Sequence, residues 1–120
     1  MKKMRIFSMI DPDVMSSVFG NNPDAIHQYV ERFVTITSVL LTKIEESIQK
    51  KDSHLAMKQF HQLKGPVGSI GFKAMYRHCE KAEEKIGQLD WEAATDCVRG
   101  VEKELNKLNK ETQRYFFLRR

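Results

Sequence analysis

Apolar residues recur three and four positions apart along four long segments of this chain, and this spacing is the strongest constraint on its fold. Such spacing aligns apolar side chains on one face of an α-helix, whereas a half-buried strand alternates apolar and polar residues. No strand-like alternation lies between the segments. The expected buried positions are Ile26, Val30, Phe33, Thr37, Leu40, Ile44 and Ile48; Ala56, Phe60, Leu63, Val67 and Ile70; Phe72, Met75, Cys79, Ala82 and Ile86; and Ala94, Val98, Val101, Leu105, Leu108 and Thr112.

Two dipeptides place a capping side chain directly before a proline, which is the favoured order at a helix start. Asp11-Pro12 predicts a short first helix that stops at Gly20. Asn22-Pro23 predicts the start of the first long helix.

The other helix ends are marked by single residues. Asp52 or Ser53 caps the third helix, and Gly71 is its expected C-terminal stop. The fourth helix is expected over about residues 73–88, and Asp90 caps the last one.

Four amphipathic helices joined by short connections pack as antiparallel neighbours that bury their apolar faces together. A chain of 120 residues is long enough for one domain with a substantial core. We therefore expect an all-α fold over residues 1–120: an antiparallel, up-down-up-down four-helix bundle with a short extra N-terminal helix.

A second stripe on the third helix contains the candidate functional residues. It consists of Met57, His61, Lys64, Gly65 and Gly68. Glycine in a helix interior costs about 1 kcal/mol relative to alanine, so two glycines beside a histidine indicate that something approaches this backbone. We expect the histidine ring to project from the surface as part of a site.

The spacing of these residues resembles a family motif. His61-x-x-Lys64-Gly65, with Gly71 ten residues after the histidine, is similar to the motif of histidine-containing phosphotransfer (HPt) domains of bacterial two-component phosphorelays. The resemblance covers most of the chain, and four spaced residues must agree for the motif to occur.

The resemblance continues in Cys79-x-x-Ala82-Glu83, where the family usually has Cys-x-x-Leu-Glu. Pro66 departs from the family, which normally has Ser or Ala there. A proline inside a helix removes one hydrogen bond and crowds the preceding turn. We expect a kink or a locally widened turn just after His61, with the helix continuing.

The resemblance implies a relay function. His61 would accept a phosphoryl group from the aspartate of a receiver domain and pass it to another receiver domain. Lys64, one turn away, can neutralise the phosphoryl charge as a point cation. The chain would bind no cofactor and would not be an enzyme, because the receiver would supply Mg²⁺ and the acidic residues. The expected partners are response-regulator receivers and a hybrid sensor histidine kinase.

The expected docking face surrounds the histidine. Besides Gly65 and Gly68, it includes Met57, Lys58 and Phe72, because exposed apolar side chains around a functional group are typical of a recognition patch. Partial burial of Met57 or Phe72 between helices is the alternative interpretation.

Composition argues against several other functions. The formal net charge is +4, but lysine and arginine alternate with glutamate along every helix, which does not favour a nucleic-acid interface. No apolar run approaches the roughly 20 residues that span a bilayer. We expect a monomeric, cytoplasmic protein. A basic helical interaction module without phosphotransfer is the alternative, and a fragment of a dimeric kinase is disfavoured because no glycine-rich nucleotide loop is present.

The four histidines and two cysteines offer a rival use as metal ligands. His54 and His61 share a face, but two helical turns separate them by about 10.5 Å, too far for one ion. The i, i+4 spacing that binds zinc is absent. We therefore expect no metal site, surface positions for His27, His54 and His78, and two reduced core thiols at Cys79 and Cys97.

Overall fold

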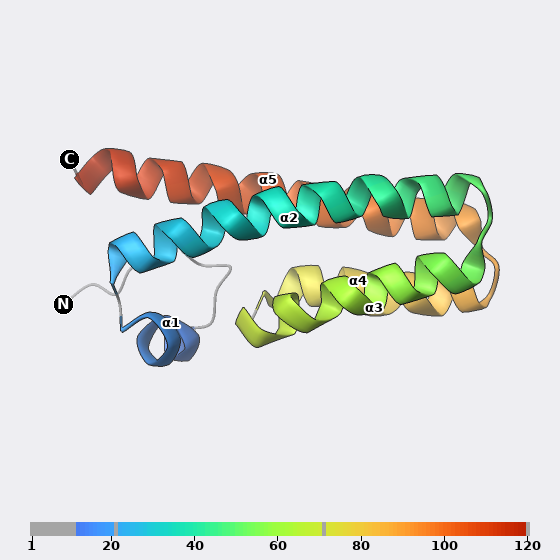
Figure 1. Cartoon of the computed structure of the whole chain (residues 1–120), viewed down its shortest axis with the longest axis horizontal. Coiled ribbons are helices and arrows are strands. Elements are labelled where there is room, and N and C mark those ends of the chain that lie inside the picture. The colour runs from blue at the N-terminus through green and yellow to red at the C-terminus, as the bar shows by residue number, and fades with distance from the viewer. Residues whose placement is uncertain (1–11, 21, 71, 120) are drawn as a thin grey trace.

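The computed structural model describes residues 12–20, 22–70 and 72–119 (Figure 1). Its helices are α1 (Pro12–Phe19), α2 (Pro23–Gln49), α3 (Ser53–Ile70), α4 (Lys73–Gly87) and α5 (Trp91–Arg119). This part of the chain contains helices and their connections and no strand. The expected all-α bundle with a short N-terminal helix is therefore confirmed.

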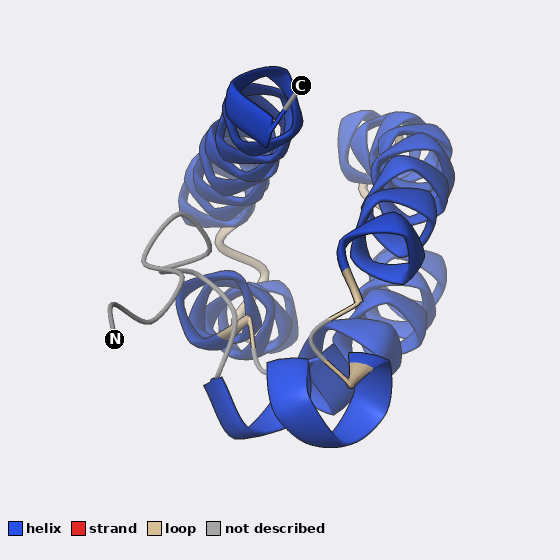
Figure 2. Cartoon of the chain, turned by 90° about the vertical axis from the view of Figure 1, so that its left-hand side faces the viewer, coloured by secondary structure: helices blue, strands red, loops and turns tan. Residues whose placement is uncertain are grey.

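The four long helices run alternately in opposite directions around one core (Figures 1 and 2). Each packs against its neighbours in a closed order: α2 against α3, α3 against α4, α4 against α5, and α5 against α2. At 27 and 29 residues, α2 and α5 are longer than α3 and α4, which have 18 and 15. Consequently α2 and α5 extend beyond the other two helices at one end, where α1 lies crosswise and packs against α2.

The helix starts follow the capping pattern. The Asn22 side chain accepts hydrogen bonds from the backbone N–H groups of Asp24 and Ala25, at 3.0 and 3.3 Å. Pro23 is the first residue of α2. Similarly, α1 begins at Pro12 and is followed by Gly20 in a left-handed conformation, with φ +57°. The predicted cap Asp11 lies outside the described residues.

The connections from α2 to α3 and from α4 to α5 are built alike. Each has one residue in the left-handed region, Lys51 at φ 56° and Leu89 at φ 60°. An aspartate follows and caps the next helix: Asp52 accepts from the Leu55 N–H and Asp90 from the Ala93 N–H, both at 3.1 Å. A left-handed residue after a helix lets the chain reverse within a few residues. These two reversals make the neighbouring helices antiparallel.

The apolar core follows the predicted stripes except at one position of α2, and Ser47 and Gln59 are buried beside it. On α2 the buried residue is Leu41, 3% exposed, whereas Leu40 is half-buried against the side of α3. A helix turns every 3.6 residues, so strict alternation of threes and fours drifts off the core face over a 27-residue helix. The side chain of Ile70 and the expected stop Gly71 lie outside what the structure describes.

Pro66 does not interrupt α3, which continues to Ile70 as expected. The proline is exposed, so the carbonyl that loses its helical donor lies near solvent. Gly65 directly before it has no Cβ to crowd the proline ring, which favours the helical conformation at this position. The kink itself stays a prediction.

Gly100, in the middle of α5, is a contact point for α4. A Cβ at this position would lie 2.6 Å from Cε1 and Nδ1 of His78. The imidazole therefore occupies the space that a side chain on α5 would fill. His78 is half-buried between the two helices, so its predicted surface position is only partly right.

Replacing Gly100 by alanine should lower the free energy of unfolding by about 1 kcal/mol, because the clash with His78 outweighs the better helix preference of alanine. Urea unfolding measures this change. In a His78→Ala background the same replacement should instead raise the free energy of unfolding by about 1 kcal/mol. Equal effects in both backgrounds would show that His78 is not the obstacle.

Candidate functional site

The apolar face of α3 orients the candidate site. Phe60, Leu63 and Val67 are at most 2% exposed and lie in the bundle core. His61 follows Phe60 and is exposed, as is Gly65 one turn later. The two residues therefore lie on the outward face of α3, where a second protein can reach the imidazole.

The two glycines of the stripe have different surroundings. A Cβ at Gly65 would meet no atom within 4 Å, so a partner protein can approach this part of the backbone. A Cβ at Gly68 would lie 3.1 Å from Cε2 of Tyr76 on α4. The missing side chain of Gly68 thus leaves space for the Tyr76 ring between α3 and α4. Gly65 is the glycine whose backbone a partner protein can approach, as expected.

Lys64 is not a free cation. Its Nζ lies 3.3 Å from Oε1 of Glu83 on α4, and 5.4 Å from the centre of the Tyr76 ring. Burial lowers the pKa of Lys64, but the hydrogen bond and charge of Glu83, helped by Tyr76 and Glu80, outweigh it and raise the pKa overall. Lys64 therefore stays protonated one turn from His61.

Glu83 belongs to the site because it contacts Lys64. In the sequence it stands out only as part of the motif Cys79-x-x-Ala82-Glu83, which predicts no role for it. The signal was available in the spacing. Tyr76 and Glu83 are seven residues apart, as are Met57 and Lys64, and two helical turns keep each pair on one flank. What the sequence does not show is that these flanks of α3 and α4 face each other.

The remaining docking residues divide into three cases. Lys58 is exposed, as expected. Met57 is half-buried and packs against the core, so only part of it can contact a partner. Phe72 was expected both in the buried stripe of the fourth helix and on the docking face, and the second expectation is wrong: it is 1% exposed, and its ring centre lies 4.8 Å from that of Phe33. The turn between α3 and α4 directs this ring into the core, where α2 covers it.

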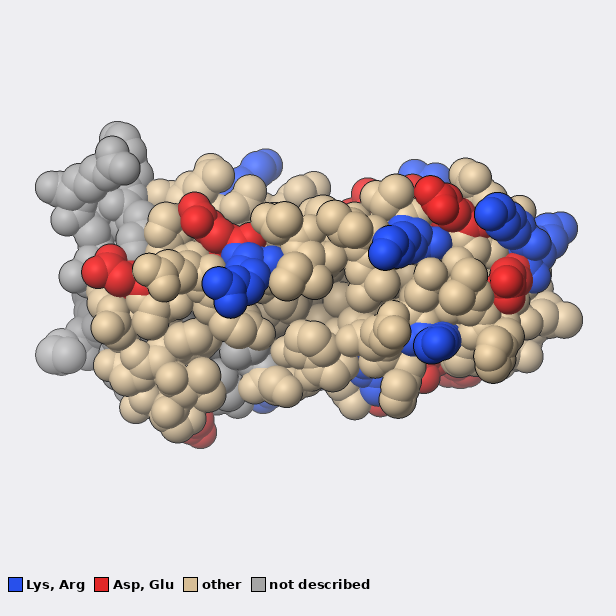
Figure 3. All heavy atoms as spheres, in the orientation of Figure 1, with Lys and Arg blue, Asp and Glu red and all other residues tan. Residues whose placement is uncertain are grey.

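A groove between α2 and α3 borders the site and was not predicted. Its volume is about 530 Å³. Its lining includes Arg32, Ile36, Val39, Leu40, Lys43, Gln62 and Pro66. Ile36 and Val39 are 59% and 54% exposed, and their spacing of three residues places them on the same side of α2. Uncharged atoms cover the middle of the face on which α2 and α3 lie in front (Figure 3). The signal was two apolar residues lying off the core stripe of α2.

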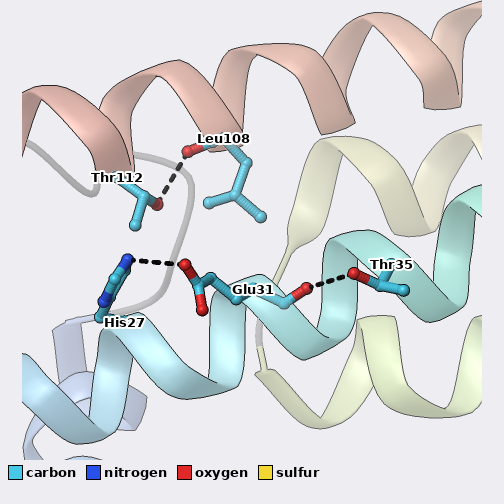
Figure 4. Close-up of polar contacts among 5 residues, drawn as sticks. All are labelled: His27, Glu31, Thr35, Leu108 and Thr112. Atoms are coloured by element: carbon cyan, nitrogen blue, oxygen red, sulfur yellow. Dashed lines mark hydrogen bonds and ion pairs between the residues drawn. The ribbon is translucent and has the colours of Figure 1, made fainter.

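His27 lies apart from this arrangement. His27 is near the start of α2, where its Nε2 lies 3.1 Å from Oε1 of Glu31 (Figure 4). On the facing helix α5, the buried Thr112 donates its hydroxyl to the Leu108 carbonyl at 2.8 Å.

Within the described ranges, no three His, Cys, Asp or Glu side chains are grouped so that they could hold a metal ion.

Both cysteines are free and buried, as predicted. Burial raises the pKa of Cys79 to about 12, with a further contribution from the charge of Glu83 that Lys64 opposes. Burial also raises the pKa of Cys97. The thiolate is the reactive form of cysteine, so both side chains behave as apolar core residues.

Both thiols should therefore react with an alkylating reagent only as the protein unfolds. At about pH 8, a pKa of about 12 leaves roughly one Cys79 side chain in 10⁴ as thiolate. Mass spectrometry after a timed exposure measures the modification, and the same protein in denaturant is the control. Modification of the native protein at the rate of the denatured one would contradict the burial.

Comparison with known proteins identifies the class. Residues 28–111 match the family model of the Hpt domain, and this match covers more than two-thirds of the chain. The chain therefore belongs to the Hpt domain family. Its members are histidine phosphotransfer modules of two-component phosphorelays, not enzymes in their own right, and response-regulator receivers are their partners.

No significant match was found among curated proteins or among solved structures. In the described part of the chain, none of the helices combines the length and the apolar character that crossing a bilayer requires.

Proposed function

We propose that this chain is a phosphorelay intermediate in which His61 accepts a phosphoryl group from a receiver aspartate and passes it to another receiver. One observation carries the assignment: within the matched region, an exposed imidazole lies beside open backbone at Gly65 and one turn from the cation of Lys64. This combination gives a partner access to a nucleophile and to a charge that stabilises phosphate.

The transfer conserves the phosphoryl group. The unprotonated ring nitrogen of His61 donates its lone pair to phosphorus, and the phosphorus–oxygen bond to the receiver's aspartate breaks. The electron pair of that bond leaves on the aspartate carboxylate, and the proton on the other ring nitrogen stays in place. In the second step, the carboxylate of another receiver attacks the same phosphorus and the imidazole leaves.

The partner's contribution is part of the proposal. Phosphoryl transfer needs positive charge around the transferring group, usually including a divalent metal ion. Lys64 can supply one positive charge from this chain. We propose that the receiver brings Mg²⁺ together with the carboxylates that hold it.

Docking would use the outward face of α3 and the α2–α3 groove beside it. Gly65 and Lys58 surround the histidine, and the groove offers Ile36 and Val39 for apolar contact. Arg32 and Lys43 line the groove as cations. A receiver surface with an apolar centre and acidic residues at its margin would complement this arrangement. A hybrid kinase as phosphoryl source, a monomeric state and a cytoplasmic location remain predictions of the same assignment.

Replacing His61 by glutamine should abolish transfer of radiolabelled phosphate from a phosphorylated receiver. Because the side chain is exposed, the free energy of unfolding should change by less than about 0.5 kcal/mol. His54→Gln is the matched control, since it replaces another exposed histidine of α3 and should transfer normally. Uptake of acid-labile phosphate by the His61 variant would show that another residue is the acceptor.

Replacing Ile36 by glutamine should weaken receiver binding about fivefold, because an apolar contact in the α2–α3 groove is lost. Isothermal titration with a receiver that accepts phosphate from this chain measures the change. Leu89→Gln is the control: Leu89 is 62% exposed, close to the 59% of Ile36, but lies in the α4–α5 connection at the far end of the bundle. Equal affinities of the two variants would exclude the groove from docking.

A further inference from the structure

The ion pair between Lys64 and Glu83 connects the candidate site to α4. The two side chains are 23% and 21% exposed, and Nζ and Oε1 are 3.3 Å apart. Oε1 of Glu83 is closed off from solvent and has no partner among the described residues other than the Lys64 ammonium. The ammonium group of Lys64 is therefore the charge that compensates this buried oxygen. Removing a partner from a buried carboxylate is strongly unfavourable.

Lys64 is held on this side of α3 by more than one contact. The Tyr76 ring lies 5.4 Å from Nζ, within the range of a cation–π interaction. That ring is itself seated against Gly68, where a larger residue would displace it. Tyr76 and Glu83 thus hold Lys64 toward α4, on the flank of α3 that adjoins His61.

A phosphoryl group on His61 would compete for the same cation. Residues three apart on a helix are neighbours, with Cβ atoms about 5–6 Å apart. A phosphoryl group carries nearly two negative charges near neutral pH. The flexible stem of Lys64 lets its ammonium reach either side, but moving it to the phosphoryl group leaves the Glu83 carboxylate without its charge partner. The two anions share one cation.

We propose that Glu83 is a positioning residue that limits how far Lys64 neutralises phosphohistidine, and so keeps the phosphoryl group on His61 ready to leave. This inference rests on the proposed function. Positive charge assists transfer only where it stabilises the loose, metaphosphate-like transition state more than the phosphoryl oxygens of phosphohistidine. A cation held fully on these oxygens would stabilise phosphohistidine. Glu83 holds the Lys64 ammonium away from the phosphoryl oxygens, so that the phosphoryl group can still move both to and from His61.

The test uses Glu83→Gln, which keeps the size of the side chain and removes its charge. Phosphoramidate labels His61 without a partner protein: its phosphorus–nitrogen bond breaks, ammonia leaves, and the bond to the imidazole forms. ³¹P NMR then follows the half-life of phosphohistidine and the pKa of its phosphoryl group. Glu83→Gln should lengthen the half-life about two- to fivefold and lower the phosphoryl pKa, because Lys64 is released toward the dianion.

Two comparisons isolate the role of Lys64. Glu84→Gln removes an exposed carboxylate of the same helix that is not among the groups raising the pKa of Lys64, and it should leave both readings unchanged. In a Lys64→Gln background, Glu83→Gln should have no effect, since the cation that Glu83 restrains is gone. An effect of the same size in that background would indicate simple repulsion between Glu83 and the phosphoryl group, and would overturn the proposal. So would a Glu83→Gln variant that behaves like the wild type.

A measurement on the wild-type protein covers the case in which Glu83→Gln does not fold. On phosphorylation, the ¹³C resonance of the Glu83 carboxylate should shift more than that of Glu84, because the ion partner of Glu83 moves. Equal shifts would overturn the inference while leaving the relay function intact. Failure of phosphoramidate to label the wild type at His61 would instead contradict the proposed function.

Discussion

Burial of one face of α3 is the constraint on which the site depends. Phe60, Leu63 and Val67 are almost completely enclosed, so α3 cannot rotate about its axis without exposing them. Fixing this rotation directs His61 and Gly65 outward, because successive helical residues are about 100° apart. The accessible imidazole is therefore a consequence of core packing, and no local contact of the ring is needed to explain its exposure.

Glycines set the distance between neighbouring helices at two places. Gly68 receives the Tyr76 ring from α4, and Gly100 receives the His78 ring, also from α4. In both contacts a planar side chain of α4 occupies the position of a missing Cβ. Helix α4 is thereby held between α3 and α5, and the first of these contacts places Tyr76 beside the ammonium group of Lys64.

The two flanks of α3 differ in character. Toward α4, Lys64 meets Glu83 in an ion pair that is mostly shielded from water. Toward α2, Gln62 and Pro66 border an apolar groove. His61 lies on the outward face between a polar flank and an apolar one. A partner that approaches the histidine therefore meets both kinds of surface, which suits one binding face with separate contacts for charge and for apolar side chains.

Local patterns predicted most of the fold. The caps Asn22 and Asp90 and nearly every core residue follow from spacing and capping, because these depend on neighbours a few positions away. The errors arose where the geometry is not local. Phe72 fits both the buried stripe of α4 and the docking face by its place in the sequence, and only the packing of α2 over its ring decides between them. Leu40 and Leu41 are adjacent, so the exact rotation of a long helix decided which is buried.

By itself, the sequence determined the helical bundle, its chain order and the histidine with its flanking lysine and glycines, because helical periodicity places these residues on defined faces. Only the tertiary structure decided what lies opposite each face. The pairing of Lys64 with Glu83, the seat of Tyr76 on Gly68 and the groove between α2 and α3 all join separate helices. Their existence depends on the relative rotation and spacing of those helices, which the packing of the whole core sets.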